Sequence, residues 1–515
     1  MAAVRHRRAR RLVIIGFGPV AARLIDDLRP AVRDRRLQIL IIGAESEPAY
    51  NRIMIGEVAL GRTDPEMLIM SDPAELRSDG VDVRLGTAVI DIDRGRRYVT
   101  LGDGDQYAYD QLVFATGAAA RAPRLNGLRV QPGGTDPVLP DGVAVLRDLA
   151  DASRLRSMTG PGRRLVVLGG GVLGMELALT AAEEGAAVFM VHTGRVPMER
   201  NLDGIAAGLV ARHLRRRQVT VIADAQAADV RLESGRFAAL ALADGRQVAG
   251  DALLLCCGAA PRTTLAERIG LSVDNGIVVD HELRSPTDDA IFAIGDCARI
   301  RCADPSCDRC APYTGPSGLI GPGWAQAEWL ARRLMADKPT APLDAGSGNA
   351  PVMIVKAPGL SIVSAGRIDS DPLDALLDDD ASTPGVAQWS DPEHGRYAKM
   401  ITRDGALEGL ICVGMPRTAA ELTLLYERRA ELPGDRSALL RHDGPDHATV
   451  ADPAGPEVTI CRCNGVTAGQ IGAAVDEGHD DIAAIGRATR AGTGCGTCKD
   501  RICELLNNRA KVVMA

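Results

Sequence analysis

The chain has 515 residues, 46% of them hydrophobic, which at roughly 150 residues per domain suggests three or four domains with packed cores. Its net charge of −7 gives no general attraction to nucleic acid, and the basic opening RHRRARR is expected to be a solvated tail. Twelve cysteines without an export signal favour metal or redox use over a disulfide framework. We expect a soluble, cytoplasmic protein that binds neither nucleic acid nor membrane.

The first predicted unit is a buried strand, a glycine-rich turn and a helix, which follow one another near the N-terminus. Gly16 and Gly18 allow a tight turn close to a pyrophosphate, and Ala21 allows the helix to pack closely on the strand. A second strand over 37–43 is followed by Glu45, at the distance where an acidic side chain meets ribose hydroxyls. This pattern predicts one bound nucleotide.

A second dinucleotide signature follows a predicted antiparallel meander over 83–114. Gly169, Gly171 and Gly174 have the full G-x-G-x-x-G spacing between a strand and a helix. The stretch 165–182, which contains this signature, is apolar for long enough to resemble a membrane span. Its glycines and Glu176 fit a nucleotide fold better. A second bound nucleotide is therefore expected.

The strand after this signature ends at His192, where NAD enzymes usually carry an acidic residue for the ribose 2′-hydroxyl. Arg195 lies close behind it, so the sequence leaves both NADH and NADPH open. His192 is interpreted equally well as an exposed strand-end residue without a ligand. If Arg195 binds a 2′-phosphate, Arg195→Ala should raise the KM for NADPH and leave the KM for NADH nearly unchanged.

Two further short motifs complete a family pattern. Thr116 and Gly117 belong to an ATG motif, and Gly295 and Asp296 form a GD motif. Together with the two glycine signatures, these residues resemble the FAD- and NAD(P)-dependent pyridine nucleotide oxidoreductases, a similarity that covers roughly residues 10–335. The resemblance implies FAD in the first site and NAD(P)H in the second.

The same resemblance implies individual roles. Asp296 would bond the flavin ribityl chain, and Arg52 would lie near the flavin. The segment 192–203 resembles more specifically the flavoprotein part of NAD(P)H-dependent nitrite reductases and the related reductase subunits of assimilatory nitrate reductases, which favours NADH as the donor. The residues expected to contact the two nucleotides are Gly16, Gly18, Ala21, Glu45, Arg52, Thr116, Gly117, Gly169, Gly171, Gly174, Glu176, His192, Arg195, Gly295 and Asp296.

An insertion after Asp296 departs from the family pattern and carries Cys302, Cys307 and Cys310. Their C-x4-C-x2-C spacing occurs in plant-type ferredoxins, and Cys297 is a candidate fourth ligand. So short an insertion cannot supply the fold that surrounds a ferredoxin loop, and a zinc site or surface thiols stay open as alternatives. We expect that replacing the three cysteines by serine leaves the iron and zinc content unchanged.

The segment 457–515 carries two cysteine pairs, with Cys461 and Cys463 spaced C-x-C and Cys495 and Cys498 spaced C-x-x-C. Four thiolates suit an iron-sulfur cluster better than zinc here, since zinc sites more often use two wider C-x-x-C pairs. The segment resembles the [2Fe-2S] domain of bacterioferritin-associated ferredoxins, which implies these four cysteines as ligands. Helices are expected over 468–477, capped by Thr467, and over 481–488.

The predicted fold class is α/β, with two Rossmann-like nucleotide-binding domains of the glutathione-reductase kind, an α+β interface domain and a small helical [2Fe-2S] domain. The interface domain resembles that of rubredoxin-reductase-like flavoproteins. The resemblance leaves open that this domain supports a homodimer. Strands are expected over 352–363 and 397–413, and a helix over 418–431. The expected domains are 10–150 and 265–340 for FAD, 151–264 for NAD(P)H, 345–432 for the interface, 433–456 as linker, and 457–515 for the cluster.

The resemblance implies an electron path from NAD(P)H through FAD and the [2Fe-2S] cluster. The chain ends before the sirohaem domain of complete nitrite reductases, so a separate catalytic subunit, a nitrate or nitrite reductase, is the expected partner. Two other classes stay open. One is a flavin dehydrogenase subunit acting on an amino acid or opine, and the other is a non-enzymatic redox-sensing or iron-storage-associated module.

Overall fold

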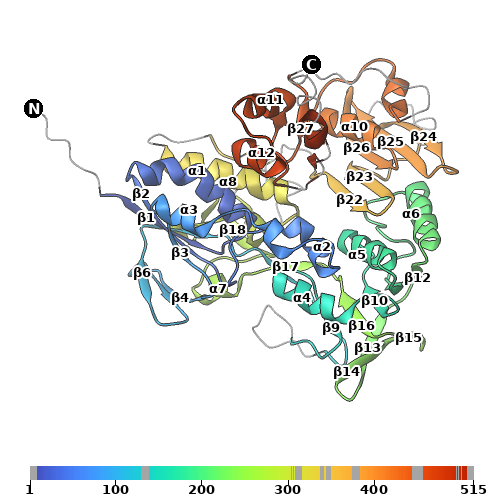
Figure 1. Cartoon of the computed structure of the whole chain (residues 1–515), viewed down its shortest axis with the longest axis horizontal. Helices are drawn as coiled ribbons and strands as arrows, with labels where there is room; N and C mark the ends of the chain where they lie inside the picture. The colour runs from blue at the N-terminus through green and yellow to red at the C-terminus, as the bar shows by residue number, and fades with distance from the viewer. Residues whose placement is uncertain are drawn as a thin grey trace, which may run out of the picture.

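Figure 1 shows the computed structural model, in which two mainly parallel sheets, a five-stranded antiparallel sheet and a small helical unit are assembled. The helical unit, coloured red, lies beside α1 (Pro19–Arg33) and α8 (Ile320–Met335). This arrangement confirms the predicted α/β class with two Rossmann-like sheets. The structure describes residues 8–128, 138–302, 304, 307, 316–336, 341–343, 350–373, 383–443, 456–494, 496, 498, 499 and 501–506.

The first domain is built on a six-stranded sheet in the order β19-β20-β7-β1-β2-β3. At its centre, β1 (Arg10–Ile15) pairs in parallel with β2 (Leu37–Ile42) and β7 (Gln111–Phe114). These strands are covered on both faces, which explains their nearly continuous apolar sequences. β20 (Asp288–Ala293) pairs with β7, so the chain returns to this sheet after completing the second domain.

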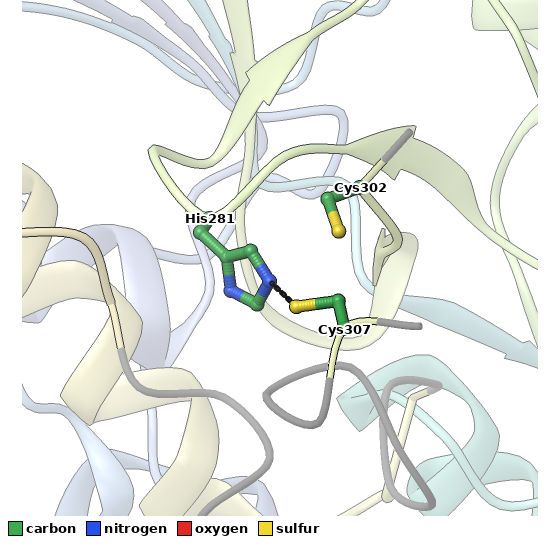
Figure 2. Close-up of side chains that lie close together, drawn as sticks. All are labelled: His281, Cys302 and Cys307. Atoms are coloured by element: carbon green, nitrogen blue, oxygen red, sulfur yellow. Dashed lines mark hydrogen bonds between the residues drawn. The ribbon is translucent and has the colours of Figure 1, made fainter. Parts of the chain in front are cut away.

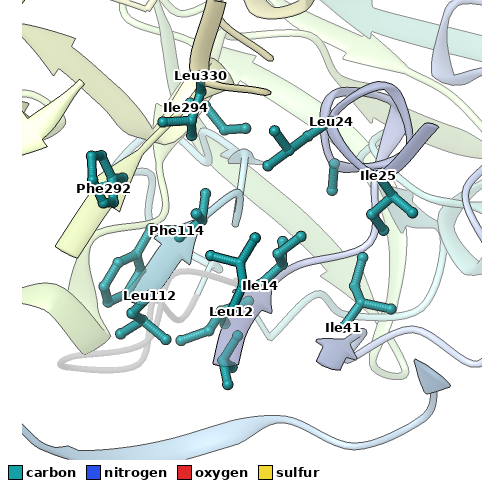
Figure 3. Packing of buried hydrophobic residues seen from close by; sticks show 14 of the residues in the cluster. Leu12, Ile14, Leu24, Ile25, Ile41, Leu112, Phe114, Phe292, Ile294 and Leu330 are labelled. Carbon is teal, nitrogen blue, oxygen red and sulfur yellow. The ribbon is translucent and has the colours of Figure 1, made fainter. Parts of the chain in front are cut away.

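One hydrophobic core joins this sheet to its helices (Figure 3). Leu12 and Ile14 of β1 pack with Leu24 and Ile25 of α1 and with Leu330 of α8. The core fixes the end of β1 and the start of α1, and therefore the glycine turn between them. The other elements of this domain are η1 (Arg52–Met54), α2 (Ile55–Ala59), η2 (Pro65–Leu68), α3 (Pro73–Ser78), β3 (Asp82–Arg84), α7 (Thr264–Arg268), β18 (Ile277–Val279), β19 (Arg284–Ser285), η3 (Gly295–Cys297) and β21 (Ala298–Ile300).

The predicted meander is present as three antiparallel strands, β4 (Val89–Asp93), β5 (Tyr98–Leu101) and β6 (Gln106–Ala108). It is shorter than the predicted range of 83–114. The two ends of that range belong instead to β3 and β7 of the parallel sheet, where Val83, Leu112 and neighbouring apolar side chains are buried.

The second domain has a five-stranded sheet in the order β12-β11-β10-β16-β9. β10 (Arg164–Leu168) pairs in parallel with β11 (Ala187–Val191) and β16 (Ala252–Leu255), and α5 (Val172–Glu183) begins directly after the second glycine turn. The domain also contains β9 (Val143–Ala144), α4 (Leu149–Met158), α6 (Gly204–Arg216), β12 (Thr220–Ile222), β13 (Ala227–Glu233), β14 (Arg236–Leu242) and β15 (Gln247–Ala249), and β8 (Ala118–Ala120) with β17 (Ala259–Pro261) connects the two domains.

The third unit is an antiparallel sheet in the order β22-β23-β26-β25-β24. The single strand expected over 352–363 is in fact two strands, because Gly359 turns the chain with φ of +68°. The strand pair expected over 397–413 is confirmed. The elements are β22 (Met353–Ala357), β23 (Leu360–Gly366), β24 (Gly385–Asp391), β25 (Arg396–Arg403), β26 (Ala406–Val413), α10 (Pro416–Arg428) and η4 (Arg436–Arg441), the last of which lies within the segment expected as a linker.

A buried polar cluster fastens this sheet to the second domain. Asp203 caps α6 through the backbone N–H of Ala206, at 3.0 Å. It also accepts hydrogen bonds from the Tyr397 hydroxyl at 2.6 Å and from Lys399 Nζ at 3.2 Å. The ammonium of Lys399 is buried, so separating the sheet from α6 would leave this charge without its carboxylate partner. The contact therefore holds the two units together.

The C-terminal unit contains β27 (Thr459–Cys461), β28 (Val466–Thr467), α11 (Ala468–Asp476) and α12 (Ile482–Thr489). The predicted cap at Thr467 is confirmed: its hydroxyl accepts from the backbone N–H of Gln470, and the Gln470 side-chain oxygen accepts from the Thr467 N–H. The unit has its own small hydrophobic core around Ile471, Ile485 and Ile502.

Candidate functional site

The first glycine turn has the shape of a phosphate cradle. Gly16 has a φ of +103°, and a Cβ atom added there would lie 2.3 Å from the carbonyl oxygen of Ala115. Gly18 is the N-cap of α1, so the N–H groups of the first helical turn face the loop. Gly117, with φ of +65°, borders open space in which an added Cβ would meet no atom within 4 Å. These residues fit a dinucleotide pyrophosphate.

Four charged side chains are linked to one another beside this turn. Glu45 accepts a hydrogen bond from the Tyr50 hydroxyl at 2.6 Å and forms an ion pair with Arg52. Arg52 donates to the backbone oxygen of Arg147 at 2.8 Å, and Arg147 in turn pairs with Asp296 at 2.7 Å. Burial raises the pKa of Tyr50, which keeps its hydroxyl protonated as a donor.

The structure thus brings Glu45, Arg52 and Asp296, three of the predicted contacts, into one connected set. Arg147 completes that set, and sequence reasoning missed it. No motif marks this arginine, because its role depends on the approach of the loop before α4 to η3. Thr116, another predicted contact, donates from its hydroxyl to the backbone oxygen of Arg262 at 3.0 Å.

The second glycine turn is more tightly constrained than the first. A Cβ on Gly169 would lie 2.2 Å from the carbonyl oxygen of Cys256, and a Cβ on Gly174 would lie 2.2 Å from that of Gly169. Gly171, the N-cap of α5, borders open space instead. The turn therefore packs closely against the protein on one side and leaves room for a ligand at the helix N-terminus.

The end of β11 differs from the sequence-based expectation in one respect. His192 is 6% exposed rather than an exposed strand-end residue, and burial lowers its pKa. Its Nε2 has no hydrogen-bond partner among the described residues. Arg195 is exposed. The carboxylate of Glu199 lies next to Gly194, since a Cβ added to Gly194 would lie 2.3 Å from one of its oxygens. An acidic group is thus present beside this strand end, supplied by a residue that the sequence did not indicate.

A cavity of about 130 Å³ lies where the two domains meet. Met54 and Glu57 line it from the first domain, and Leu173 and Glu176 line it from α5 of the second. The predicted contact residue Glu176 therefore lines a space between α2 and α5, which Ile354 of β22 also lines.

The cysteines of the C-terminal unit lie at its two ends, with Cys461 and Cys463 at β27 and Cys498 beyond α12. Cys461 and Cys498 are buried, and Cys463 is half-buried, while Cys495 lies outside the described residues. A hydrogen bond from the Cys498 thiol, helped by the N–H groups of Gly492 and Asn464, lowers the pKa of Cys461 to about 6. The lowered pKa favours the thiolate form of Cys461, which is the form that binds metal.

This unit is docked at the edge of the first glycine turn. The side-chain amide of Asn51, next to Arg52, donates to the backbone oxygens of Gly494 and of Thr493, the latter at 3.5 Å. A Cβ on Gly494 would lie 2.9 Å from Cβ of Cys463 and 3.1 Å from the ring of Trp324, so all three groups are neighbours.

Contacts with α1 fix the same docking position. Arg23 donates to the Asn464 side chain at 3.3 Å, and Arg490 pairs with Asp27 at 3.3 Å. The Trp324 indole N–H donates to the backbone oxygen of Pro19, the first residue of α1, at 3.3 Å. The cysteine-bearing loop thus lies against the helix that begins at the first glycine turn.

The inserted cysteines are brought next to a histidine that the sequence did not indicate. The ligand atoms of His281, Cys302 and Cys307 lie within 4.8 Å of one another (Figure 2). Cys297 is instead fully buried in the core of the first domain, where its thiol donates to the backbone oxygen of Phe114 at 3.5 Å. Cys310 lies outside the described residues.

In the part of the chain that the structure describes, no helix is both long and apolar enough to cross a membrane.

Two family descriptions match the chain. Residues 10–313 match "Pyridine nucleotide-disulphide oxidoreductase", and residues 459–508 match "BFD-like [2Fe-2S] binding domain". The first match bears out FAD with NAD(P)H, and the second bears out the cluster, as the cofactors predicted for these segments.

Three curated proteins show what the chain is similar to. It is 26% identical over 97% of its length to the nitrite reductase [NAD(P)H] of Bacillus subtilis, and equally identical, over the same share, to the assimilatory nitrate reductase electron transfer subunit of that organism. The chain spans only 58% and 60% of the lengths of these two relatives. Over 56% of its length it is 34% identical to the biphenyl dioxygenase system ferredoxin–NAD(+) reductase component of Paraburkholderia xenovorans, of which it covers 67%.

Solved structures share the fold. The putidaredoxin reductase of a covalent putidaredoxin complex aligns with a TM-score of 0.69 at 21% identity, over 85% of this chain and 97% of the other. A ferredoxin reductase from Rhodopseudomonas palustris gives the same TM-score at 21% identity, over 82% and 95%.

Proposed function

The chain belongs to the pyridine nucleotide-disulphide oxidoreductase family, and we propose that it passes electrons from NAD(P)H through FAD and a [2Fe-2S] cluster to a separate protein. The observation that carries this proposal is the docking of Gly494, the neighbour of Cys463, against Trp324 and Asn51, beside the first glycine turn. When bound, the nicotinamide supplies a hydride to the flavin, and the flavin can release electrons singly to the cluster.

The residues of the first site would bind and orient FAD. The turn at Gly16 and the N-terminus of α1 would hold the pyrophosphate of FAD, and Glu45 would hold ribose hydroxyls. Asp296 would accept from the ribityl chain, with Arg147 as the residue that positions its carboxylate. Arg52 lies between Glu45 and the loop before α4, where it would keep a positive charge near the flavin.

We propose a nitrate or nitrite reductase catalytic subunit as the acceptor, in the cytoplasm, where NAD(P)H is available. The similarity of nearly the whole chain to the two Bacillus subtilis proteins supports this choice. The test combines the purified holoprotein with a purified nitrate reductase or nitrite reductase catalytic subunit and follows NADH-dependent consumption of nitrate or nitrite. Rapid dye reduction without consumption of either anion would reject this class of acceptor while leaving the electron path in place.

NADH is proposed as the working donor because a carboxylate, that of Glu199, lies beside the end of β11. Glu199→Gln should raise the KM for NADH by about ten- to a hundredfold, since a hydrogen bond to a charged group is worth roughly 1.5 to 3 kcal/mol. It should change the KM for NADPH little. The measurement is steady-state dye reduction with each nucleotide, and Glu233→Gln, an exposed glutamate of β13, is the matched control. An equal effect on both nucleotides would remove Glu199 from the ribose site, and a selective effect of Arg195→Ala on NADPH would assign the 2′ position to Arg195.

A further inference from the structure

The group formed by His281, Cys302 and Cys307 is built by the strand register of the first domain. β18 and β21 pair in parallel, with Val279 opposite Ile300, and the Arg301 N–H extends the pairing to the oxygen of Val279 at 2.7 Å. His281 and Cys302 each lie two residues beyond that last pair. The fold therefore places them side by side at the same end of the two strands (Figure 2).

Hydrogen bonds to the backbone oxygen of Asp304 hold the third member near this point. The Cys307 N–H donates to the oxygen of Asp304 at 3.3 Å, and the Cys302 thiol donates to the same oxygen at 3.5 Å. Cys307 Sγ then lies 3.4 Å from Nε2 of His281. We propose that these three side chains bind a zinc ion, at a site separate from the [2Fe-2S] cluster.

The distances fit this ion. With Zn–S near 2.3 Å and Zn–N near 2.0 to 2.1 Å, a tetrahedral site has its sulfur and nitrogen ligands about 3.6 Å apart. The observed separation of 3.4 Å between Cys307 and His281 is close to that value, and all three ligand atoms lie within 4.8 Å of one another. Binding the ion thus requires only small movements of the side chains.

The histidine is oriented as a metal ligand. Its Nδ1 lies 3.2 Å from the backbone oxygen of Leu343, and the Leu343 N–H donates to the His281 oxygen at 2.8 Å. A carbonyl oxygen only accepts, so Nδ1 carries the proton and Nε2 offers its lone pair toward Cys307. A backbone carbonyl on the far ring nitrogen is the usual support of a metal-bound histidine.

The donor set selects the metal. Two thiolates and one imidazole suit zinc, and their two negative charges neutralise the divalent ion. Three protein ligands leave one coordination position for a water molecule or a further ligand. Because His281 belongs to the first domain and the cysteines belong to the insertion, the ion would tie the insertion to that domain. This inference does not depend on the electron path proposed above, and it replaces the expectation that the cysteines leave the zinc content unchanged.

The test measures metal in the purified full-length holoprotein. We expect about one zinc per chain in addition to the iron of the cluster. Exchange with Co²⁺ should give the strong visible absorption of tetrahedral cobalt with thiolate ligands. His281→Ala and Cys307→Ser should each lose that zinc and that absorption while keeping the FAD, the cluster iron and the dye reductase activity. His394→Ala, which removes an exposed imidazole from another domain, should keep the zinc.

Three results would overturn the proposal. One is wild-type protein that takes up neither zinc nor cobalt when its cluster is intact. Another is an unchanged zinc content in both variants, which would place the metal elsewhere. The third is a disulfide between Cys302 and Cys307 in protein purified with zinc present. Cys307→Ser keeps both hydrogen bonds between His281 and Leu343, so it remains informative if His281→Ala fails to fold.

Discussion

Cys463→Ser is expected to abolish most electron delivery to the catalytic partner while NAD(P)H oxidation with a small dye continues at the wild-type rate. The variant removes one of the four predicted thiolate ligands, and with it the cluster. Hydride transfer needs only the two nucleotide sites, where the reacting atoms must meet at roughly 3 to 3.5 Å. Cys463 contacts Gly494 and lies near Trp324, outside both glycine turns. Rapid-mixing spectra should show flavin reduction at the normal rate without bleaching of the cluster.

The matched control is Cys503→Ser. This half-buried cysteine belongs to the same unit but lies outside the four-cysteine pattern, so its replacement should preserve both the cluster and the delivery of electrons. If partner-coupled activity survived in a Cys463→Ser protein shown to lack the cluster, the flavin would reach the partner directly. The linear path through Cys461, Cys463, Cys495 and Cys498 would then be wrong.

Gly174→Val is expected to slow NAD(P)H oxidation severely while the protein keeps its FAD. Even the first side-chain atom would lie 2.2 Å from the backbone oxygen of Gly169, so the second glycine turn must move. A displaced turn misaligns the N–H groups at the start of α5 that would hold the nucleotide pyrophosphate. We expect kcat/KM for NADH to fall at least about a hundredfold, or roughly 2.7 kcal/mol of transition-state stabilisation. The flavin spectrum and the cluster content should stay normal.

Gly208→Ala is the control for this substitution. Gly208 is exposed in α6 of the same domain, and an added Cβ would meet no atom within 4 Å. Alanine should be neutral there, or stabilise the protein by about 0.5 to 1 kcal/mol, because glycine weakens a helix interior. Wild-type kinetics in a folded Gly174→Val protein would show that this turn does not hold the nucleotide.

Local patterns made much of the fold predictable. The two glycine turns depend on conformations that only glycine adopts easily, as the φ of +103° at Gly16 and of +123° at Gly169 shows. The spacing of the glycines therefore reveals both turns in the sequence. The cap at Thr467 was predictable for a similar reason, because the capping interaction spans only three residues. The strand over 352–363 was predicted too long, since apolar periodicity alone does not reveal the turn at Gly359.

The contacts that the sequence did not reveal join segments that are distant in sequence. Arg147 reaches Asp296 only because the loop before α4 meets η3. Asn51 meets Gly494 only when the C-terminal unit is docked on the first domain. His281 joins Cys302 through the register of β18 and β21, which no spacing rule encodes. In each case the chemistry of the residue is ordinary, and its partner is supplied by tertiary structure.

The central claim is that electrons from NADH reach the cluster through the flavin. The most direct measurement is an anaerobic titration of the holoprotein with NADH, followed by electron paramagnetic resonance of the reduced [2Fe-2S] cluster. We predict that NADH alone produces this signal in the wild-type protein. In Gly174→Val the signal should appear at once with dithionite, and at least about a hundredfold more slowly than in the wild type with NADH. A wild-type cluster that dithionite reduces and NADH leaves oxidised, although the flavin is bleached, would contradict the account.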